Sequence, residues 1–85
     1  MVEKKLIGKI SHFYPKISVA VVDLEDTLRK GDKILIERAS GSFEQVVDSM
    51  EIEHKQVVEA TKGQSIGLRV IEKIREGAKV FKIIE

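Results

Sequence analysis

The stretch FEQVVDSMEIEHKQVVEA, residues 43–60, decides the fold class, because its apolar residues fit two different periods. From Phe43 to Met50 they recur at i, i+3, i+4 and i+7, which is the spacing of one helix face. Val46, Met50 and Ile52 also share one side of a strand, in which alternate residues face the same way. The stretch is therefore either the lone helix of an α/β protein or a long strand of an all-β protein.

The residue types within 43–60 favour the strand. Two Val-Val pairs, at 46–47 and 57–58, are β-branched, and β-branched residues lose χ1 freedom in a helix. A continuous helix would also place Ile52 outside the apolar stripe. We therefore expect a strand here, broken near residues 54–55.

Turn-forming glycines and one proline separate the rest of the chain into short runs rich in Val, Ile and Leu. These runs predict strands at residues 6–14, 17–24, 34–37, 65–71 and 79–84. Strands that recur about every 8–12 residues are typical of a β-barrel or a β-sandwich. No linker, repeat or low-complexity segment interrupts them, so residues 1–85 are expected to form a single domain.

The composition narrows the function classes. The 85 residues include 15 basic and 14 acidic side chains, so the net charge of +1 gives no overall attraction to nucleic acid. Cys is absent, which excludes disulfides, thiolate metal sites and a Cys nucleophile. No apolar run approaches the ~18 residues of a membrane span, and we expect a cytoplasmic protein with no membrane partner. The high content of Lys and Glu is typical of a thermophilic source.

Five short motifs occur in order along the chain. They are Gly8, the Leu-Arg-Lys-Gly-Asp of 28–32, the Val-Asp-Ser-Met of 47–50, the segment 59–68 and the segment 76–80. Together they resemble the second domain of translational GTPases such as elongation factor Tu, and small archaeal elongation factor-like proteins that consist of this barrel alone. Similar barrels end the collagenase-like peptidases, a family connected with RNA modification. The resemblance implies an all-β fold, a closed Greek-key β-barrel of six or seven strands.

The function that this resemblance implies is a translation-factor-like module that binds RNA (tRNA or rRNA) or a partner protein in translation or RNA modification. The alternative is a protein-interaction module that acts as the detached C-terminal domain of a larger peptidase-like or RNA-modifying enzyme. Residues 17–24 are apolar on both strand faces, which exceeds what one barrel interior needs. A homodimer or docking on a partner would cover the excess.

No catalytic motif is present, so the chain is not expected to be an enzyme. It lacks the G-x-x-x-x-G-K-[ST] sequence that cradles nucleotide phosphates, and neither a nucleotide nor another cofactor is expected. His12 and His54 could form a metal or acid–base pair, but no Cys or clustered carboxylates accompany them, so no metal site is predicted. Asp48 has the opposite strand parity from Glu51 and Glu53, so these carboxylates do not share a face.

An RNA site is the functional site that the residue pattern supports. His12 and Tyr14 can stack on bases while nearby lysines contact phosphates, as sites for single-stranded RNA require. The predicted RNA-binding residues, which would converge at one end of the barrel, are Lys9, His12, Tyr14, Lys16, Arg29 and Lys30. Roles in structural turns are predicted for Gly31, Asp32, Gly63, Gly67 and Gly77, with the Asp32 side chain capping its turn.

Overall fold

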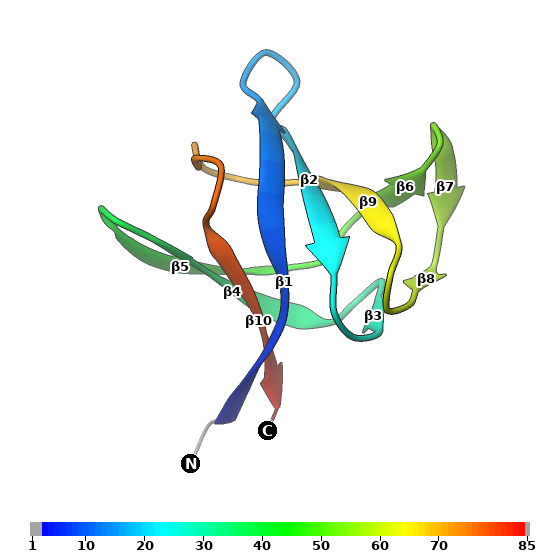
Figure 1. The fold of residues 1–85 in the computed structure, drawn as a ribbon, viewed down its shortest axis with the longest axis horizontal. Helices are drawn as coiled ribbons and strands as arrows, with labels where there is room; N and C mark the ends of the chain where they lie inside the picture. Colours follow the sequence, from blue (N-terminus) through cyan, green and yellow to red (C-terminus); the bar gives the residue numbers. More distant parts are fainter. Residues whose placement is uncertain (1–2, 85) are drawn as a thin grey trace.

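The computed structural model describes residues 3–84, and every regular element in them is a β-strand (Figure 1). The all-β prediction is therefore confirmed. The strands are β1 (Glu3–Tyr14), β2 (Val19–Leu24), β3 (Leu28–Arg29), β4 (Lys33–Arg38), β5 (Gly41–Val46), β6 (Met50–Ile52), β7 (Lys55–Val57), β8 (Glu59–Ala60), β9 (Ser65–Arg69) and β10 (Lys79–Ile84). Residues 3–84 contain no helix long and apolar enough to cross a membrane.

The stretch 43–60 is extended, as its β-branched residues predict, but it is divided into pieces. It contributes most of β5 and all of β6, β7 and β8. The turn between β6 and β7 has two central residues, Glu53 and His54, with φ of 50° and 65°. A two-residue hairpin turn of this hand requires positive φ at both central residues. The expected break near 54–55 is present at this turn, and two further breaks, at 47–49 and at Val58, were not predicted.

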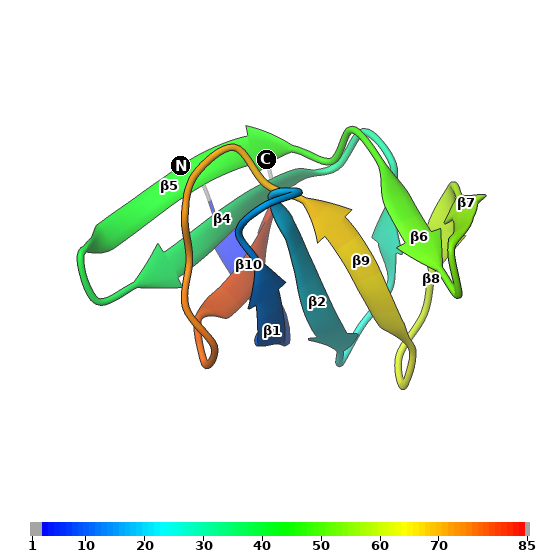
Figure 2. The same cartoon turned by 90° about the horizontal axis from the view of Figure 1, so that it is seen from above.

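The strands form one curled antiparallel sheet in the order β5-β4-β10-β1-β2-β9-β6-β7, and β3 pairs separately with β8. Seen from above, β4 and β5 lie along one side, while β1, β2 and β9 lie along the other (Figure 2). Within residues 3–84 the ladder of backbone hydrogen bonds ends at β5 and at β7. It does not close into the predicted barrel of six or seven strands, because 43–60 supplies short edge strands in place of one long closing strand.

A side chain bridges the open side of the sheet. Gln45 on β5 points inward and is only 8% exposed. Its Nε2 donates a hydrogen bond to the Arg69 carbonyl over 2.8 Å, and its Oε1 accepts one from the Ile71 N–H over 3.0 Å. The side-chain amide therefore both donates and accepts a backbone hydrogen bond, as a peptide group does between paired strands. It joins β5 to the segment that follows β9.

The core lies inside the curl and comes from alternate residues of the strands. On β2, Ala20, Val22 and Leu24 are buried, whereas Val21 is half-buried. Residues 17–24 are apolar at both strand parities, but only one face of β2 is fully buried. Ile17 precedes β2 and is 63% exposed. The largest side chains with almost no exposed area are Ile7, Ile10, Leu28, Ile34, Ile36, Met50, Ile66 and Leu68.

Candidate functional site

The six predicted RNA-binding residues fall into two separate groups. Lys9, His12 and Tyr14 lie on β1, and Lys16 is in the turn that follows it. Arg29 is on β3, and Lys30 follows that strand. The turn after β1 and strand β3 lie at opposite sides of the molecule (Figure 1). The structure therefore does not bring the six residues to one end of the fold.

The group on β1 contains an aromatic pair. The rings of His12 and Tyr14 meet edge to face, with 4.4 Å between their centroids and 63° between their planes. The His12 Nδ1 also lies 3.0 Å from the Glu76 Oε2, which fixes the ring against the segment between β9 and β10. Tyr14 is 47% exposed, so part of its side chain faces solvent at this end of β1.

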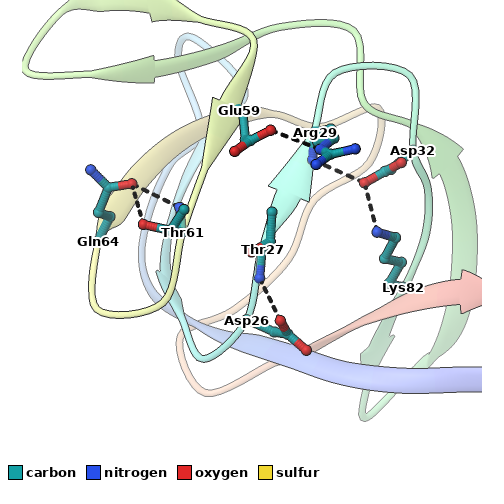
Figure 3. Close-up of polar contacts among 8 residues, drawn as sticks. All are labelled: Asp26, Thr27, Arg29, Asp32, Glu59, Thr61, Gln64 and Lys82. Carbon is teal, nitrogen blue, oxygen red and sulfur yellow. Dashed lines mark hydrogen bonds and ion pairs between the residues drawn. The ribbon is translucent and has the colours of Figure 1, made fainter.

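The group on β3 belongs to a corner built from ion pairs (Figure 3). The Arg29 Nε lies 2.7 Å from the Glu59 Oε2. The Asp32 Oδ2 accepts a hydrogen bond from the Arg29 N–H over 2.9 Å and also lies 3.2 Å from the Lys82 Nζ. Asp32 thus caps the turn after β3 and ties it to β10. The guanidinium of Arg29 already has a carboxylate partner, which makes it a weaker candidate for phosphate contact.

The predicted turn glycines differ in backbone conformation. Gly31, Gly63 and Gly77 have φ of 97°, 90° and 90°, which side-chain-bearing residues rarely adopt. Gly67 does not have a positive φ; a Cβ there would lie 3.4 Å from the Val19 Cγ1. Its predicted turn role is therefore replaced by a position inside β9. Gly41, one of the glycines that separate the apolar runs in the sequence, has a φ of 125° at the start of β5.

An open groove of about 1060 Å³ lies between the end of β1, the β4–β5 turn and the segment 73–79. Phe13, Ile74 and Ala78 supply apolar lining. The charged lining residues are Glu37, Arg38, Lys73, Arg75, Glu76 and Lys79. By formal charge the lining is therefore net positive, with four cations to two carboxylates. The groove was not predicted, because its walls come from three segments that are distant in sequence.

Arg38 is the structural support of this groove. Its Nε donates to the Gly41 carbonyl over 3.0 Å, and its Nη2 lies 2.8 Å from the Glu72 Oε1. Its Nη1 donates to the Lys73 carbonyl, and the guanidinium lies 4.8 Å from the centroid of the Phe43 ring. Arg38 therefore holds the β4–β5 turn against the segment that forms the opposite wall.

Within residues 3–84, no group of three or more His, Asp or Glu side chains is arranged to hold a metal ion. His12 is on β1 and His54 is in the turn between β6 and β7, so the two histidines belong to different elements. The structure gives no geometric support to an acid–base pair between them.

The chain is similar in sequence to parts of longer proteins. No protein-family model matches it. An uncharacterized protease of Methanocaldococcus jannaschii is 42% identical over 80 residues, which are 93% of this chain and 20% of that protein. A collagenase of Porphyromonas gingivalis is 33% identical over 82 residues, which are 94% of this chain and 23% of the collagenase. The chain thus spans between 20% and 23% of the length of these relatives.

Solved structures of one domain share the fold. Two crystal structures of the C-terminal domain of a Geobacillus thermoleovorans protein, assigned to the U32 peptidases, match with TM-scores of 0.84 and 0.86 at 18% identity. The first match covers 89% of this chain and 96% of that domain, and the second covers 92% and 91%. The architecture is therefore that of a known, separately folded domain.

These comparisons correct two predictions. The similar proteins are named as a protease, collagenases and a U32 peptidase, so the resemblance to translation elongation factors, and with it the translation assignment, is wrong. The expectation that the protein is not an enzyme is contradicted by the same names, although this chain matches only about a fifth of the M. jannaschii protease. The alternative, a detached domain of a peptidase-like enzyme, is better supported than the translation-factor module.

The motifs on which the resemblance to translation factors rested have structural roles in this fold. Gly31 adopts a φ that favours glycine, and Asp32 bonds the backbone of its own turn. The Leu-x-x-Gly-Asp sequence of residues 28–32 therefore serves the geometry of its own turn. Such motifs indicate a fold and do not distinguish the functions that different proteins build on it.

Proposed function

We propose that this chain acts as the C-terminal domain of a U32 peptidase-like enzyme and binds the remainder of that enzyme, here called the peptidase body. The observation that supports this most is the 42% identity with the M. jannaschii protease across 93% of the chain. The fold match to an isolated U32 C-terminal domain agrees with it.

The structure supports a binding role for the domain. Its buried apolar residues form one cluster inside the curl of the sheet, drawn from most of the strands. A fold with its own core needs no partner to become ordered, so its contribution to a larger enzyme is made through its surface. Within residues 3–84, no buried side-chain polar atom lacks a hydrogen-bond partner, as is usual in a stably folded domain.

The test uses the M. jannaschii protease from which the matched 80 residues have been deleted. We expect this chain, added as a separate protein, to bind the truncated protease with a Kd in the micromolar range or below, measured by calorimetry. Hydrolysis of gelatin by the truncated protease should rise when the chain is added. The control is this chain with Ile36→Asp, which buries a charge at a position with 0% exposure and should prevent folding. Absence of binding would contradict the proposed function.

RNA contact by the β1 end is a second candidate, supported by the His12–Tyr14 aromatic pair beside a groove whose lining is net positive. Three or four phosphate contacts would give a slope of about −2 to −3 in log affinity against log salt. The double variant Lys9→Ala, Lys16→Ala should flatten that slope. The matched control is Arg29→Ala, Lys30→Ala, on the other side of the molecule, which should leave the slope unchanged. Equal effects of the two variants would argue against a site at β1.

A further inference from the structure

The solvent-facing side of the sheet at β1, β10 and β4 carries a row of large apolar side chains. In the strand register, Leu6 on β1 pairs with Phe81 on β10, and Phe81 pairs with Leu35 on β4. Directly paired residues of neighbouring strands have Cβ atoms about 4.5–5.5 Å apart, so the three side chains lie side by side. Ile83, two residues after Phe81, has the same parity and extends the row along β10.

This row faces away from the core. The neighbours of opposite parity, Ile34, Ile36 and Val80, have no exposed area. Phe81 and Leu35 are half-buried, yet they are not among the partly buried side chains that pack against the core. Their partial burial therefore comes from one another and from the residues around them on the outer surface. We call Leu6, Leu35, Phe81 and Ile83 the outer apolar row.

Charges of both signs surround the outer apolar row. The Lys4 Nζ lies 3.6 Å from the Glu37 Oε2 and 4.5 Å from the centroid of the Phe81 ring. On the far side of Leu35, the Lys33 Nζ lies 3.2 Å from the Glu44 Oε1. Lys9 and Lys79 pair with each other on the same face, and Lys79 also pairs with Glu37, so carboxylates and cations alternate around the row. An apolar centre with a polar rim is the usual composition of a protein–protein interface.

We propose that the outer apolar row is the surface on which the peptidase body docks, an inference that rests on the proposed function. In the Geobacillus protein the matching domain is C-terminal, so the rest of that protein precedes the strand that corresponds to β1. Leu6 is on the first half of β1, beside the last strand β10, and the outer ends of these two strands lie together (Figure 1). A body that leads into β1 therefore lies next to this face and can cover it.

The length of the relatives agrees with this occupant. This chain matches 20% of the M. jannaschii protease, so most of that protein lies outside the matched domain and is available as the partner. Apolar surface on a small domain is expected to be covered when a larger unit of the same protein is its neighbour. A second copy of this chain is the competing occupant, and the experiment separates the two.

The experiment measures binding of the truncated M. jannaschii protease by wild-type chain and by two double variants. Leu6→Glu with Leu35→Glu places two charges within the outer apolar row. Val58→Glu with Ile71→Glu is the matched control, because these apolar residues are 72% and 69% exposed and are not on β1, β10 or β4. We expect the first variant to bind at least about 30-fold more weakly and the control to bind within about threefold of wild type. Circular dichroism checks folding, and the milder Leu35→Ser serves if the Glu variant does not fold.

Each result has a distinct meaning. If wild type and the outer-row variant bind equally, the docking surface is elsewhere and the proposed function stands. If wild type does not bind at all, while the excised domain of the M. jannaschii protease does, both proposals fail for this chain. If sedimentation shows that wild-type chain dimerises and the outer-row variant does not, the occupant is a second copy and the docking proposal is overturned.

Discussion

The central ladder of β10, β1, β2 and β9 and the stretch 41–60 hold the fold together in different ways. In the ladder, β1 pairs with β10 on one side and β2 on the other, and β2 pairs with β9. In 41–60, β5 has one paired neighbour, and β6 and β7 are three residues each. The ladder rests on repeated backbone hydrogen bonds, whereas the fit of 41–60 depends on single side chains and one strained turn. Substitutions should therefore act by different mechanisms in the two regions.

Gln45→Leu should give the largest loss of stability in 41–60. It removes the amide that joins β5 to the chain after β9, and it leaves the Arg69 carbonyl and the Ile71 N–H without their partner. Each unsatisfied group costs about 1–3 kcal/mol, so we expect unfolding to become easier by about 2–4 kcal/mol in urea titration. Glu44→Gln, on the solvent face of the same strand, is the control and should change stability by about 0.5 kcal/mol or less. Equal effects of the two variants would show that the bridge contributes little.

Gly8→Ala tests the ladder where two backbones approach closely. A Cβ at Gly8 would lie 2.6 Å from the Asp23 carbonyl oxygen and 2.9 Å from the Val22 Cγ1. The carbonyl belongs to paired strand β2 and cannot move without disturbing the register, so we expect a loss of about 1–3 kcal/mol. Gly67→Ala is the control, since its Cβ would meet only an ordinary contact with the Val19 Cγ1 at 3.4 Å. A smaller loss of stability for Gly8→Ala than for Gly67→Ala would mean that the backbone of β2 shifts to accommodate the added Cβ.

Replacing Glu53-His54 by Asn-Gly should raise stability. Both residues have positive φ, and side-chain-bearing residues other than Asn and Asp adopt that conformation at a cost. Asn-Gly is the preferred pair for this two-residue turn, and we expect a gain of about 1 kcal/mol in the free energy of unfolding. Ser18→Gly provides the comparison. Ser18 has a φ of 55° in the turn between β1 and β2, so this substitution relieves the strain of one residue only. A loss of stability from Asn-Gly would indicate that Glu53 or His54 makes a contribution beyond the turn.

The two regions also differ in how far the sequence predicts them. The ladder strands follow from Val, Ile and Leu runs bounded by turn residues, and the expected strands at 6–14 and 79–84 agree with β1 and β10. A break near 54–55 was predicted, but the Glu53-His54 turn carries no Gly or Asn, so its two-residue turn type did not follow from the sequence. One clue to the bridge was available: Gln45 has the parity of Phe43 and Val47, which marks a polar residue on an inward face.

The candidate sites depend on tertiary placement, which local patterns do not contain. Lys9 and Lys16 flank the His12–Tyr14 pair, but the expected convergence of Arg29 and Lys30 with them required knowing where β3 lies. The outer apolar row depends on the register of three strands, two of which are far apart in sequence. Periodicity predicts which face a residue takes within one strand, whereas the register between strands is set by the whole fold.

The smallest effect is expected at Asp26, which follows β2 and pairs with Lys5 on β1. Its hydrogen bond with Thr27 is drawn in Figure 3. Two contacts lower the pKa of the Asp26 carboxyl. The larger effect comes from the Lys5 ammonium, and the next largest from a hydrogen bond of 2.7 Å that the Thr27 backbone N–H donates. Because the pKa is lower in the folded chain than in the unfolded chain, the carboxylate stabilises the fold above the unfolded pKa. That contribution is lost as the pH falls through the folded pKa.

Asp26→Asn should therefore lower the melting temperature slightly at neutral pH, and the difference from wild type should narrow as the pH is brought from about 6 to about 2. Lys5→Met removes the largest cause of the shift and should reproduce most of this pH dependence. The double variant should then add little to either single change, because both act on one interaction. Additive effects, or a difference that widens in acid, would show that the two residues stabilise the fold independently, and the Lys5–Asp26 pair would not be a link between the ladder and the loop.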